Sequence, residues 1–499
     1  MGYPAPLLWR GFVIGKYMHY PSLEQVKSMA GQGNLVPVYR EVNADLETPV
    51  SAYLKIASGT HSFLLESVEG GERLARYSFM GTAPYRVVRT GENQPESAVD
   101  PLTIVENELS RFKPVFVDGL PRFLGGAVGY LSYDCVSYFE PRVPKRASTL
   151  TIPESVFLFT DTLIVFDHLK HKMQIVCHVN LDNDIDQSYL EAIKKIDHLV
   201  DQLMKPLAPV TPLRENSSPK NPTDSNVTRG EYHEMVRRAK EYIVAGDIIQ
   251  VVPSQRLERR TVASPFDIYR ALRRVNPSPY MYFLHMDDFD IVGASPELLV
   301  RLEEGNVDTH PIAGTRPRGK TRAEDEEFEL VLRKSEKDIA EHTMLLDLGR
   351  NDIGRVSIPG TVEVTQMMDV ERYSHVMHLV SNVSGQIKPP LNAYDALRAC
   401  FPAGTVSGAP KIRAMEIIGE LESDARGPYA GAVGYFSFSG NMDTAIAIRT
   451  SVIKDGIAYL QAGGGVVYDS DPEAEYQESL QKASALLRAI DEAEKELEQ

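Results

Sequence analysis

YMYFLHMDD (Tyr280–Asp288) and DIVGASPELLVRLE (Asp290–Glu303) follow one another in the chain with a single residue between them. Both stretches are rich in β-branched and aromatic residues, which is typical of β-strands. Their succession is hairpin-like, because no helix long enough for a βαβ unit separates them. The stretch therefore predicts an α+β fold with large, mainly antiparallel sheets.

The same strand-rich pattern continues on both sides of one boundary. Residues 205–222 contain five prolines and little apolar content, so we expect a linker or an exposed loop there. After the boundary, Thr228 and Glu231 form a capping box for a helix that ends at Gly246. Further along, residues 328–352 are expected to form one helix. Before the boundary at residues 205–222, the strand-like segments are SFLLESVE, YRVVRT, GAVGYLSY, SVFLFTDTLIVFD and MQIVCHV.

Length and composition limit the class of protein. A chain of 499 residues is too long for one ordinary core, and we expect an extension (1–35), a β-rich domain (36–204), a Pro-rich linker (205–227) and a second domain (228–490). The net charge of −16 argues against broad nucleic-acid binding. The sequence shows no secretory signal and no apolar run of membrane-spanning length. Three widely spaced cysteines indicate free thiols, so we expect a cytoplasmic protein without membrane association.

One pattern occurs twice. GGAVGYLSYD (Gly125–Asp134) and AGAVGYFSFSG (Ala430–Gly440) share the letters GAVGY followed by a residue and serine. A repeat architecture would need more copies. The pattern is therefore interpreted as two similar strands, each entered through a glycine turn.

Two acidic pairs are candidates for a metal site. Asp338 and Glu341 are three residues apart, as are Glu475 and Glu478, so each pair lies on one face of a predicted helix. Two such faces directed at one point would offer the oxygen ligands that Mg²⁺ prefers. The alternative is a pair of solvated acidic helix faces, and spacing alone leaves both open.

The segment RYSHVMH (Arg372–His378) contains a second candidate group. If it were helical, Glu371, His375 and His378 would lie together. The HExxH spacing of a zinc site is absent, so a histidine that acts as general acid or base is the functional alternative. A histidine that only packs in the core is the structural one.

Glycine-rich segments form a third group of candidates: AGTRPRG, FPAGTVSGAPK and QAGGGVV. None matches a P-loop or a dinucleotide-binding motif. Glycine amides can hold a carboxylate beside Arg449 or Lys411, although each segment could also be only a tight turn. Glu297, at a strand start, could donate a proton if burial raises its pKa, and Gln250 is placed in a strand after Gly246.

Taken in order, these segments are similar to those of the chorismate-utilising enzymes, and most of all to the anthranilate-forming branch of that family. The resemblance is dense from residue 246 to residue 478 and reaches the first half of the chain through LLESVEG and RYSFMG. It implies two large sheets packed as a sandwich, with helices outside and a central active-site cleft. The matching segments are GDIIQVVPSQR, NPSPYMYFL, GASPELLVR, PIAGTRPRG, EHTMLLDLGRNDIGRV, VERYSHVMHLVSNVSG, FPAGTVSGAPK, GAVGYF, AIAIRT and QAGGGVVYDSDPEAEYQE.

The resemblance also implies roles for single residues. Mg²⁺ would bridge a carboxylate of chorismate to Glu341 and Glu478, with Asp338 and Glu475 as supporting carboxylates. Glu297 would protonate the departing C4 hydroxyl, His378 would act in the later elimination of pyruvate, and Thr405 would lie near the ring. The residues expected to bind chorismate are Gly314, Thr315, Tyr429, Arg449, Gly463, Gly464 and Gly465.

Two positions separate this chain from other branches of the family. Gln250 stands where the isochorismate and salicylate synthases have a lysine base that activates water, which favours ammonia as the nucleophile. Ala313 stands where aminodeoxychorismate synthase has a lysine that attacks C2. Direct amination at C2 is the consistent outcome, with component I of aminodeoxychorismate synthase, or a non-catalytic regulatory protein on the same fold, as alternatives.

A regulatory site is also implied. Leu65, Glu66 and Ser67, together with Pro279, Tyr280 and Met281, resemble a tryptophan feedback pocket, which would make residues 36–204 the regulatory domain and 228–490 the chorismate-binding domain. No glutaminase triad is recognisable in the sequence. The nitrogen is therefore expected to come from free ammonia or from a glutamine amidotransferase subunit in a hetero-oligomer.

Overall fold

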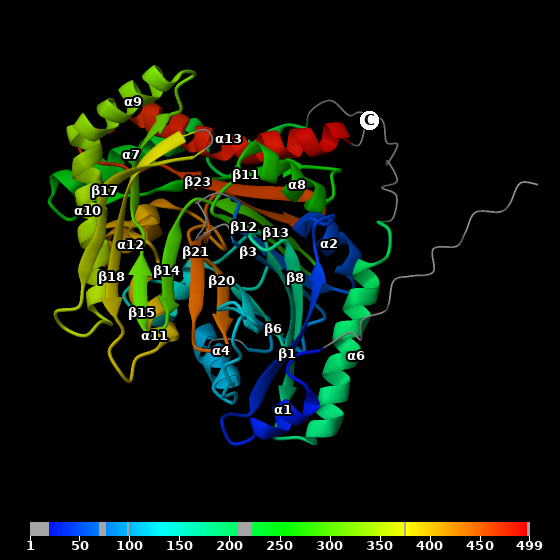
Figure 1. Cartoon of the computed structure of the whole chain (residues 1–499). Coiled ribbons are helices and arrows are strands. Elements are labelled where there is room, and N and C mark those ends of the chain that lie inside the picture. Colours follow the sequence, from blue (N-terminus) through cyan, green and yellow to red (C-terminus); the bar gives the residue numbers. More distant parts are fainter. Residues whose placement is uncertain (1–18, 69–75, 97–98, 208–220, 374–375, 497–499) are drawn as a thin grey trace, which may run out of the picture.

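A computed structural model describes residues 19–68, 76–96, 99–207, 221–373 and 376–496 (Figure 1). Within these residues the chain forms two large sheets whose strand pairings are antiparallel, as the sequence predicts. The first sheet runs in the order β1 (Leu35–Asn43), β8 (Lys172–Asn180), β7 (Thr162–Asp167), β3 (Tyr77–Thr82), β2 (His61–Glu66), β12 (Tyr280–Met286), β13 (Asp290–Ser295), β22 (Thr450–Lys454), β23 (Ile457–Gly463), β11 (Ser254–Arg260), β9 (Thr223–Ser225).

The second sheet lies against the first and has its own order. It runs β16 (Ile312–Pro317), β18 (Val376–Gln386), β15 (Asn306–Thr309), β14 (Leu298–Glu303), β21 (Met442–Ile446), β20 (Ala432–Ser437), β5 (Gly126–Leu131), β6 (Ser155–Thr160), β4 (Arg86–Thr90), with β17 (Glu363–Arg372) also paired to β18. A short ladder joins β10 (Gln250–Val251) to β19 (Gly408–Ala409).

Alternating side chains hold the two sheets together as a sandwich. In β12, Tyr282 and Leu284 face the core between the sheets, whereas Met281 and Phe283 face the opposite core beneath the helices. In β5, Val128 lies in that same inner core. Because side chains alternate between the faces of a strand, each of these strands is apolar on both sides. The expected sandwich is confirmed.

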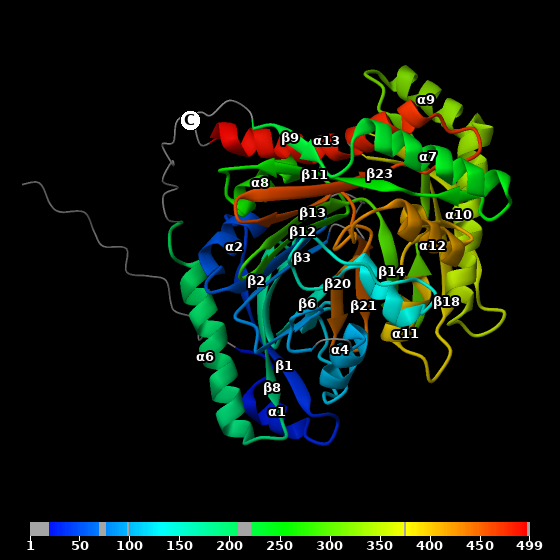
Figure 2. The ribbon, with the colours of Figure 1, turned by 180° about the vertical axis from the view of Figure 1, so that it is seen from behind.

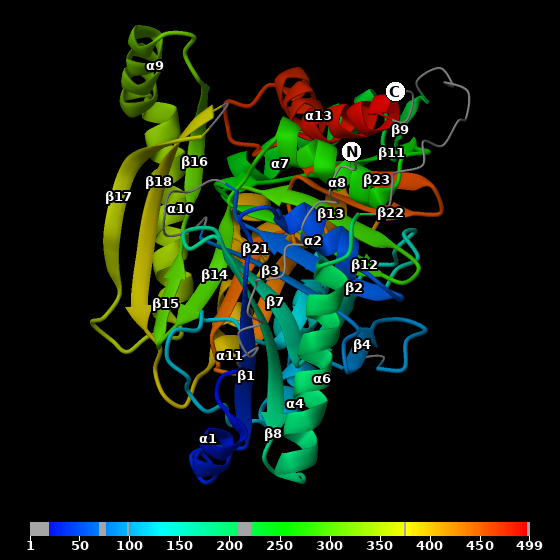
Figure 3. The same ribbon diagram turned by 45° about the vertical axis from the view of Figure 1, so that its right-hand side comes forward.

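Helices cover the outer faces (Figures 2 and 3). The first sheet is covered by α2 (Pro49–Ile56), α6 (Ile185–Leu203), α8 (Pro265–Val275) and α13 (Pro472–Glu496), and α1 (Leu23–Ser28) lies near α6. The second core packs α4 (Pro101–Leu109), α5 (Val136–Phe139), α7 (Arg229–Val244), α10 (Glu336–Gly354), α11 (Ala393–Cys400) and α12 (Lys411–Leu421), while α9 (Arg322–Lys334) protrudes beside β16.

Both sheets combine strands from the two halves of the chain. In the first sheet β2 pairs with β12, and in the second β5 pairs with β20. The two GAVGY segments are therefore neighbours, with Gly129 opposite Gly434. Part of the expected linker, Thr223–Ser225, is an edge strand rather than a free loop.

Two local expectations were wrong. Residues 328–352 do not form one helix, because Ser335 ends α9 and its side chain caps α10 by accepting from the Asp338 amide. The segment around His378 is a β-hairpin and not a helix, since Glu371 in β17 is paired with His378 in β18. His375 lies outside the described residues.

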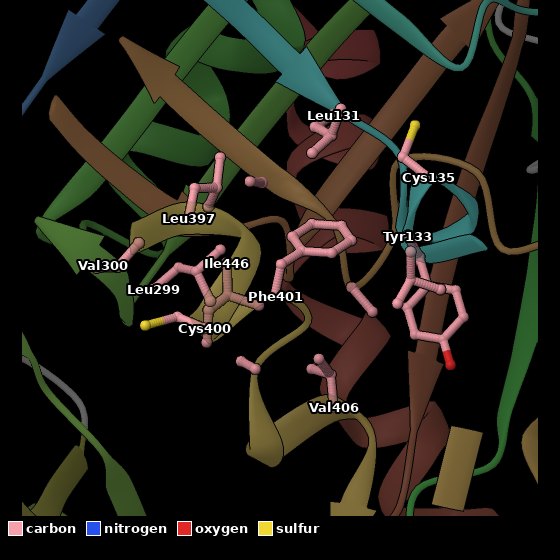
Figure 4. Close-up of a cluster of buried hydrophobic side chains, with 14 of the residues drawn as sticks. Leu131, Tyr133, Cys135, Leu299, Val300, Leu397, Cys400, Phe401, Val406 and Ile446 are labelled. Atoms are coloured by element: carbon pink, nitrogen blue, oxygen red, sulfur yellow. The ribbon is translucent and has the colours of Figure 1, made fainter. Parts of the chain in front are cut away.

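The core of the second sheet supports the loop that follows α11 (Figure 4). Phe401 and Val406 point into a cluster with Leu299 and Ile446, so the short 3₁₀ helix Gly404–Val406 rests on buried apolar side chains. Among the residues that the structure describes, no helix is long and apolar enough to cross a membrane.

Candidate functional site

Two helices carry the acidic pairs, as the spacing predicts, and the charges of the two pairs act on each other. Asp338 and Glu341 lie in the first turns of α10, and Glu475 and Glu478 lie in the first turns of α13. Burial raises the pKa of Glu341 and of Glu475, and the negative charge of Glu478 raises both further. Carboxylates from two helices therefore repel one another across a shared space.

The residues around this space fit a hard cation. Buried oxygens Oε2 of Glu475 and Oε1 of Gln250 have no hydrogen-bond partner, although such atoms are normally satisfied. The donors are all oxygens, which suits Mg²⁺ with part of its water shell retained. No group of three or more acidic, histidine or cysteine side chains converges as a closed metal cluster within the described part of the chain. A Mg²⁺ ion at this place would therefore have few protein ligands, and water and substrate oxygens would complete its coordination.

The glycines of QAGGGVV lie directly against these carboxylates. A Cβ atom on Gly464 would lie 2.4 Å from Oε2 of Glu475, and one on Gly465 would lie 2.4 Å from Nε2 of Gln250. The same Gln250 amide lies 3.5 Å from Oε1 of Glu341. Only glycine can pass so close, so this loop brings backbone amides to the edge of the acidic space.

Lys482 was not singled out by the sequence, yet it connects these parts. Its Nζ atom lies 2.8 Å from Oε1 of Glu478, one helical turn earlier, and donates to the carbonyl of Gly463 at 2.9 Å. Its positive charge also lowers the pKa of Glu341 and Glu297 against the effect of burial. The Glu478–Lys482 spacing of four residues was the available signal.

Arg449 lies at the other side of the glycine loop. Its φ is +52°, a left-handed conformation that is uncommon outside glycine, and its Nη1 donates to the Lys482 carbonyl at 2.6 Å. Tyr429 lies beside Arg449 and the glycine loop, because its hydroxyl is within hydrogen-bonding reach of the Gly463 backbone. Burial raises the pKa of Tyr429 to about 12, so its phenol stays neutral.

His378, in β18, contacts the loop that carries Gly314 and Thr315. Its Nδ1 lies 3.0 Å from the Thr315 hydroxyl and 3.1 Å from the Gly314 carbonyl. Burial lowers the pKa of the imidazole, and the nearby charge of Arg449 lowers it further. The histidine is therefore neutral at pH 7 and able to accept a proton.

Glu297 is a buried acid at the start of β14. It is 6% exposed, and burial raises its pKa to about 8, partly offset by the Thr405 hydroxyl and the Ile312 backbone. A carboxyl group with this pKa carries a proton at pH 7 and can give it up. The Thr405 hydroxyl lies close enough to Glu297 to lower its pKa.

The arginines of AGTRPRG hold the loop itself. Arg316 forms an ion pair with Asp338 at 2.6 Å, and Arg318 contacts Asp325 at 2.8 Å. Gly314 has a φ of +70° and lies against Asp338. Asp338 therefore fastens the loop as well as standing beside Glu341. Lys411 is also engaged, with Asp352 at 2.6 Å, and not with an open glycine turn.

A buried arginine beneath the site was missed by sequence reasoning. Arg426 is 2% exposed, pairs with Glu422 at 2.6 Å, and donates to the carbonyls of Val252 and Val406 at 2.6 and 2.7 Å. Its guanidinium also lies 5.5 Å from the ring centre of Tyr429. One cation thus joins the segments that carry Gln250, Thr405 and Tyr429.

A separate cavity lies between the two sheets where β2 meets β12, and we call it the β2–β12 cavity. Its empty volume, with the open solvent at its mouth included, is about 660 Å³. All six residues that the sequence grouped as a regulatory pocket line it: Leu65, Glu66, Ser67, Pro279, Tyr280 and Met281. The lining residues that sequence reasoning missed are Tyr77, Phe79, Arg122, Tyr282, Val433, Gly434, Tyr435 and Asp443.

The lining of the β2–β12 cavity is mostly apolar, and two of its residues, Glu66 and Asp443, are acidic. Glu66 accepts hydrogen bonds from Tyr269, and its Oε2 lies 3.3 Å from Arg273, but its buried Oε1 has no partner. Asp443 likewise has a buried, unpartnered Oδ1. Burial raises the pKa of both carboxyl groups. Such oxygens suit the amino group of a ligand with an apolar body.

Comparison with known proteins shows the family of the chain. Residues 60–488 match the model of the chorismate binding enzyme family. Anthranilate synthase component 1 of Acetivibrio thermocellus is 49% identical over 95% of this chain and 99% of its own length. A probable anthranilate synthase component 1 of Schizosaccharomyces pombe is 49% identical over 95% and 97%.

A solved structure gives the same result for the fold. The crystal structure of anthranilate synthase component I from Streptococcus pneumoniae superposes with a TM-score of 0.74 and 38% identity, covering 89% of this chain and 98% of that one. The family match extends over most of the chain, and the relatives match it almost end to end. The chain therefore belongs to the chorismate binding enzyme family, alongside the anthranilate synthase component 1 proteins.

Proposed function

We propose that this chain converts chorismate and ammonia into anthranilate and pyruvate. The observation that carries the proposal is the convergence of a protonated Glu297, a neutral His378 and the Arg449–glycine loop region around paired carboxylates. The names of the full-length relatives support the same activity. Each group has the protonation state that this reaction needs near pH 7.

Substrate binding follows from the charges of the site. Chorismate carries two carboxylates, and Arg449 can hold one of them in a two-pronged hydrogen bond. Amides of the Gly463–Gly465 loop, which lies against Glu475 and Glu341, would hold the other. Glu341 and Glu478 would hold Mg²⁺, which when bound supplies a Lewis acid that withdraws electrons from the ring through its carboxylate.

The chemistry proceeds in two stages on this chain's residues. In the first, ammonia attacks C2 and the C4 hydroxyl departs, taking the proton of Glu297 to leave as water. In the second, His378 takes the proton from C2 while the C3–O bond breaks, and the side chain leaves as enolpyruvate, which gains a proton at its methylene carbon to become pyruvate. Thr405 lies beside Glu297 and lowers its pKa against the effect of burial.

Two side chains favour amination at C2. Gln250 cannot deprotonate water, whereas ammonia is nucleophilic without a base. Ala313 is 6% exposed in β16 and offers no nucleophile that could attack C2 in place of ammonia. Gln250 therefore disfavours a hydroxylated product, and Ala313 disfavours amination at C4.

The nitrogen donor is proposed to be free ammonia or a glutamine amidotransferase partner, in a cytoplasmic hetero-oligomer. Glutaminases of the cysteine type need a reactive thiolate. Here Cys135, Cys177 and Cys400 are buried, and burial raises the pKa of each thiol. The chain therefore lacks a cysteine suited to releasing ammonia from glutamine by itself.

The β2–β12 cavity is proposed to bind L-tryptophan as a feedback inhibitor. Glu66 would accept from the amino group at the wall of the cavity, and Pro279 and Tyr280 would pack against the indole. Ser67 stands at the same wall and contributes a hydroxyl.

One assay tests the activity. Purified chain with chorismate, Mg²⁺ and ammonium at mildly alkaline pH should produce the fluorescence of anthranilate. Formation of 4-amino-4-deoxychorismate, detected by chromatography, would instead support the aminodeoxychorismate alternative. If neither product forms, the chain is not a chorismate-aminating enzyme and the non-catalytic alternative stands.

Replacing Ser67 by phenylalanine should relieve tryptophan inhibition. The ring would fill part of the β2–β12 cavity, so the tryptophan concentration for half-inhibition should rise by at least about tenfold, or about 1.4 kcal/mol. Anthranilate formation without tryptophan should remain largely intact. Ser67→Ala, which adds no bulk, is the matched control. Unchanged inhibition in Ser67→Phe would contradict the assignment of the cavity.

Replacing Glu341 by glutamine should weaken metal binding. Because one charged ligand becomes neutral, the affinity for Mn²⁺ with chorismate present should fall by at least about tenfold, measured from the free-ion EPR signal. Glu336→Gln, on the exposed first turn of the same helix, is the control and should bind Mn²⁺ as the parent chain does. Equal affinities in both variants would remove Glu341 from the metal site.

A further inference from the structure

One tyrosine connects the two sites described above. The ring of Tyr282 lines the β2–β12 cavity next to Met281. Its hydroxyl lies 2.6 Å from the Thr450 hydroxyl, and both side chains are buried. Thr450 is the neighbour in sequence of Arg449, so the wall of the cavity is one residue away from the proposed substrate-binding arginine.

The direction of this hydrogen bond follows from counting protons. The Thr450 hydroxyl has one proton, and it donates that proton to the Ile448 carbonyl at 2.9 Å. The Tyr282 hydroxyl must therefore be the donor to Thr450. The two bonds in series connect the cavity wall to the carbonyl on the other side of Arg449.

The turn that carries Arg449 needs such support. A non-glycine residue with φ of +52° persists only where its surroundings hold it. The Arg449 carbonyl accepts from the Ala294 amide at 3.0 Å, its Nη1 donates to the Lys482 carbonyl, and the Thr450 hydroxyl bridges to Ile448. The last of these contacts is the one that Tyr282 reinforces.

The packing of Tyr282 makes it sensitive to the cavity. A Cβ on Gly293 would lie 2.1–2.6 Å from the outer half of the ring, the hydroxyl included. The ring thus rests directly on Gly293 and cannot move toward it. If a ligand in the cavity presses on this ring, the ring cannot yield toward Gly293, and its hydroxyl would move relative to Thr450 instead.

We propose that Tyr282 and Thr450 are positioning residues for Arg449, and that an occupied β2–β12 cavity lowers the affinity for chorismate through this hydrogen bond. The regulatory half of this inference rests on the proposed function, in which the cavity takes tryptophan and Arg449 takes a chorismate carboxylate. The positioning half depends only on the geometry. Tyr282 itself touches neither the reacting carbon atoms nor the metal ligands.

The test uses two hydroxyl deletions. Tyr282→Phe and Thr450→Val each break the series, so the chorismate KM should rise about three- to tenfold while kcat stays within about twofold. Thr450→Ser retains the hydroxyl and should restore the parent KM. Tyr53→Phe, a buried tyrosine that loses a bond to Ser62 away from both sites, is the control for general loss of packing.

The coupling is measured at equilibrium. Dialysis with labelled tryptophan gives its Kd with and without saturating chorismate, and by reciprocity the ratio of the two equals the effect of tryptophan on chorismate. In Tyr282→Phe the Kd without chorismate should stay within about twofold of the parent value, and the ratio should fall close to one. Melting temperatures confirm that each variant is folded, and Tyr282→Phe suffices if Thr450→Val is not.

The outcomes separate the two proposals. A parent chain that binds no tryptophan contradicts the proposed regulation, while the KM of Tyr282→Phe still decides the positioning of Arg449. A parent ratio well above one that persists in Tyr282→Phe overturns the coupling and leaves the proposed function intact. A KM unchanged in both hydroxyl deletions overturns the positioning role. If the chain forms no product, the Kd of chorismate, measured by dialysis with labelled chorismate, replaces KM.

Discussion

Replacing Glu297 by glutamine is expected to lower kcat by about 10²- to 10⁴-fold, the range usual for the loss of a general acid. The amide retains the shape of the side chain and its contact with Thr405, but it has no proton of suitable pKa to give to the departing hydroxyl. Anthranilate fluorescence under saturating chorismate and ammonium measures the loss. Glu304→Gln, an exposed glutamate on the turn after β14, is the matched control.

The pKa of Glu297 adds a second readout. In the parent chain the acid is protonated below about pH 8, so kcat should decline above that pH, and this limb should be absent from the residual activity of Glu297→Gln. Stability also falls as pH rises, but over a lower pH range than kcat. Between pH 4.5 and about 8 the folded state keeps a proton that the unfolded chain has lost, so the parent loses stability as pH rises.

Glutamine has no carboxyl group to ionise, so the Glu297→Gln variant does not lose this stability as pH rises. The melting temperature of Glu297→Gln relative to the parent should therefore increase from pH 5 to pH 8. A variant that is more stable but inactive cannot owe its inactivity to unfolding. Nearly full activity in Glu297→Gln would remove Glu297 from the reaction.

Replacing Arg426 by methionine is expected to destabilise the fold by about 3–5 kcal/mol, because Glu422 would remain buried without its partner. The ion pair is 2.6 Å long and both side chains are buried, so the leftover charge cannot reach water. Urea denaturation monitored by circular dichroism measures the free energy of unfolding. Arg413→Met, which removes an arginine with three acidic partners at the surface, should cost at most about 1 kcal/mol.

The double variant Arg426→Met/Glu422→Gln distinguishes a charge effect from a simple loss of packing. Without a buried charge it should be more stable than Arg426→Met alone, which makes the two substitutions strongly non-additive. If instead the losses add, the carboxylate of Glu422 is not the source of the cost, and the role assigned to the pair is wrong.

Much of the fold follows from patterns that act locally. The β-branched and aromatic residues of 280–303, in hairpin-like succession, predict antiparallel strands, and β12 and β13 confirm it. The capping box at Thr228 begins α7 as expected, because it depends on residues three apart. The acidic pairs lie on helices for the same reason.

The failures have a different physical origin. The histidine segment was expected to be helical because Glu371 and His378 suit a helical spacing, yet a hairpin brings them opposite each other equally well. Residues 328–352 have helical periodicity on both sides of Ser335, and only the capping bond of that serine decides where one helix ends. Short-range spacing does not distinguish these outcomes.

Contacts between distant segments were beyond sequence reasoning. Arg426 shows no motif, because its partners at Val252 and Val406 are backbone carbonyls that any residue could supply. The second GAVGY strand was interpreted only as a strand, although Gly434 and Tyr435 line the β2–β12 cavity. Lys482 was within reach, since a lysine four residues after a glutamate on a helix is a recognisable pair.

The shared sheets also set the order in which the molecule can assemble. On the ribosome, β5 emerges long before its partner β20, and β2 long before β12. At about 5–20 residues per second, the first half waits for tens of seconds with open strand edges. Neither half can complete its sheets alone, so severing the chain at the proline-rich segment should yield two aggregation-prone fragments rather than two working domains. Nascent-chain protection, and not only the final contacts, is therefore part of what this sequence requires.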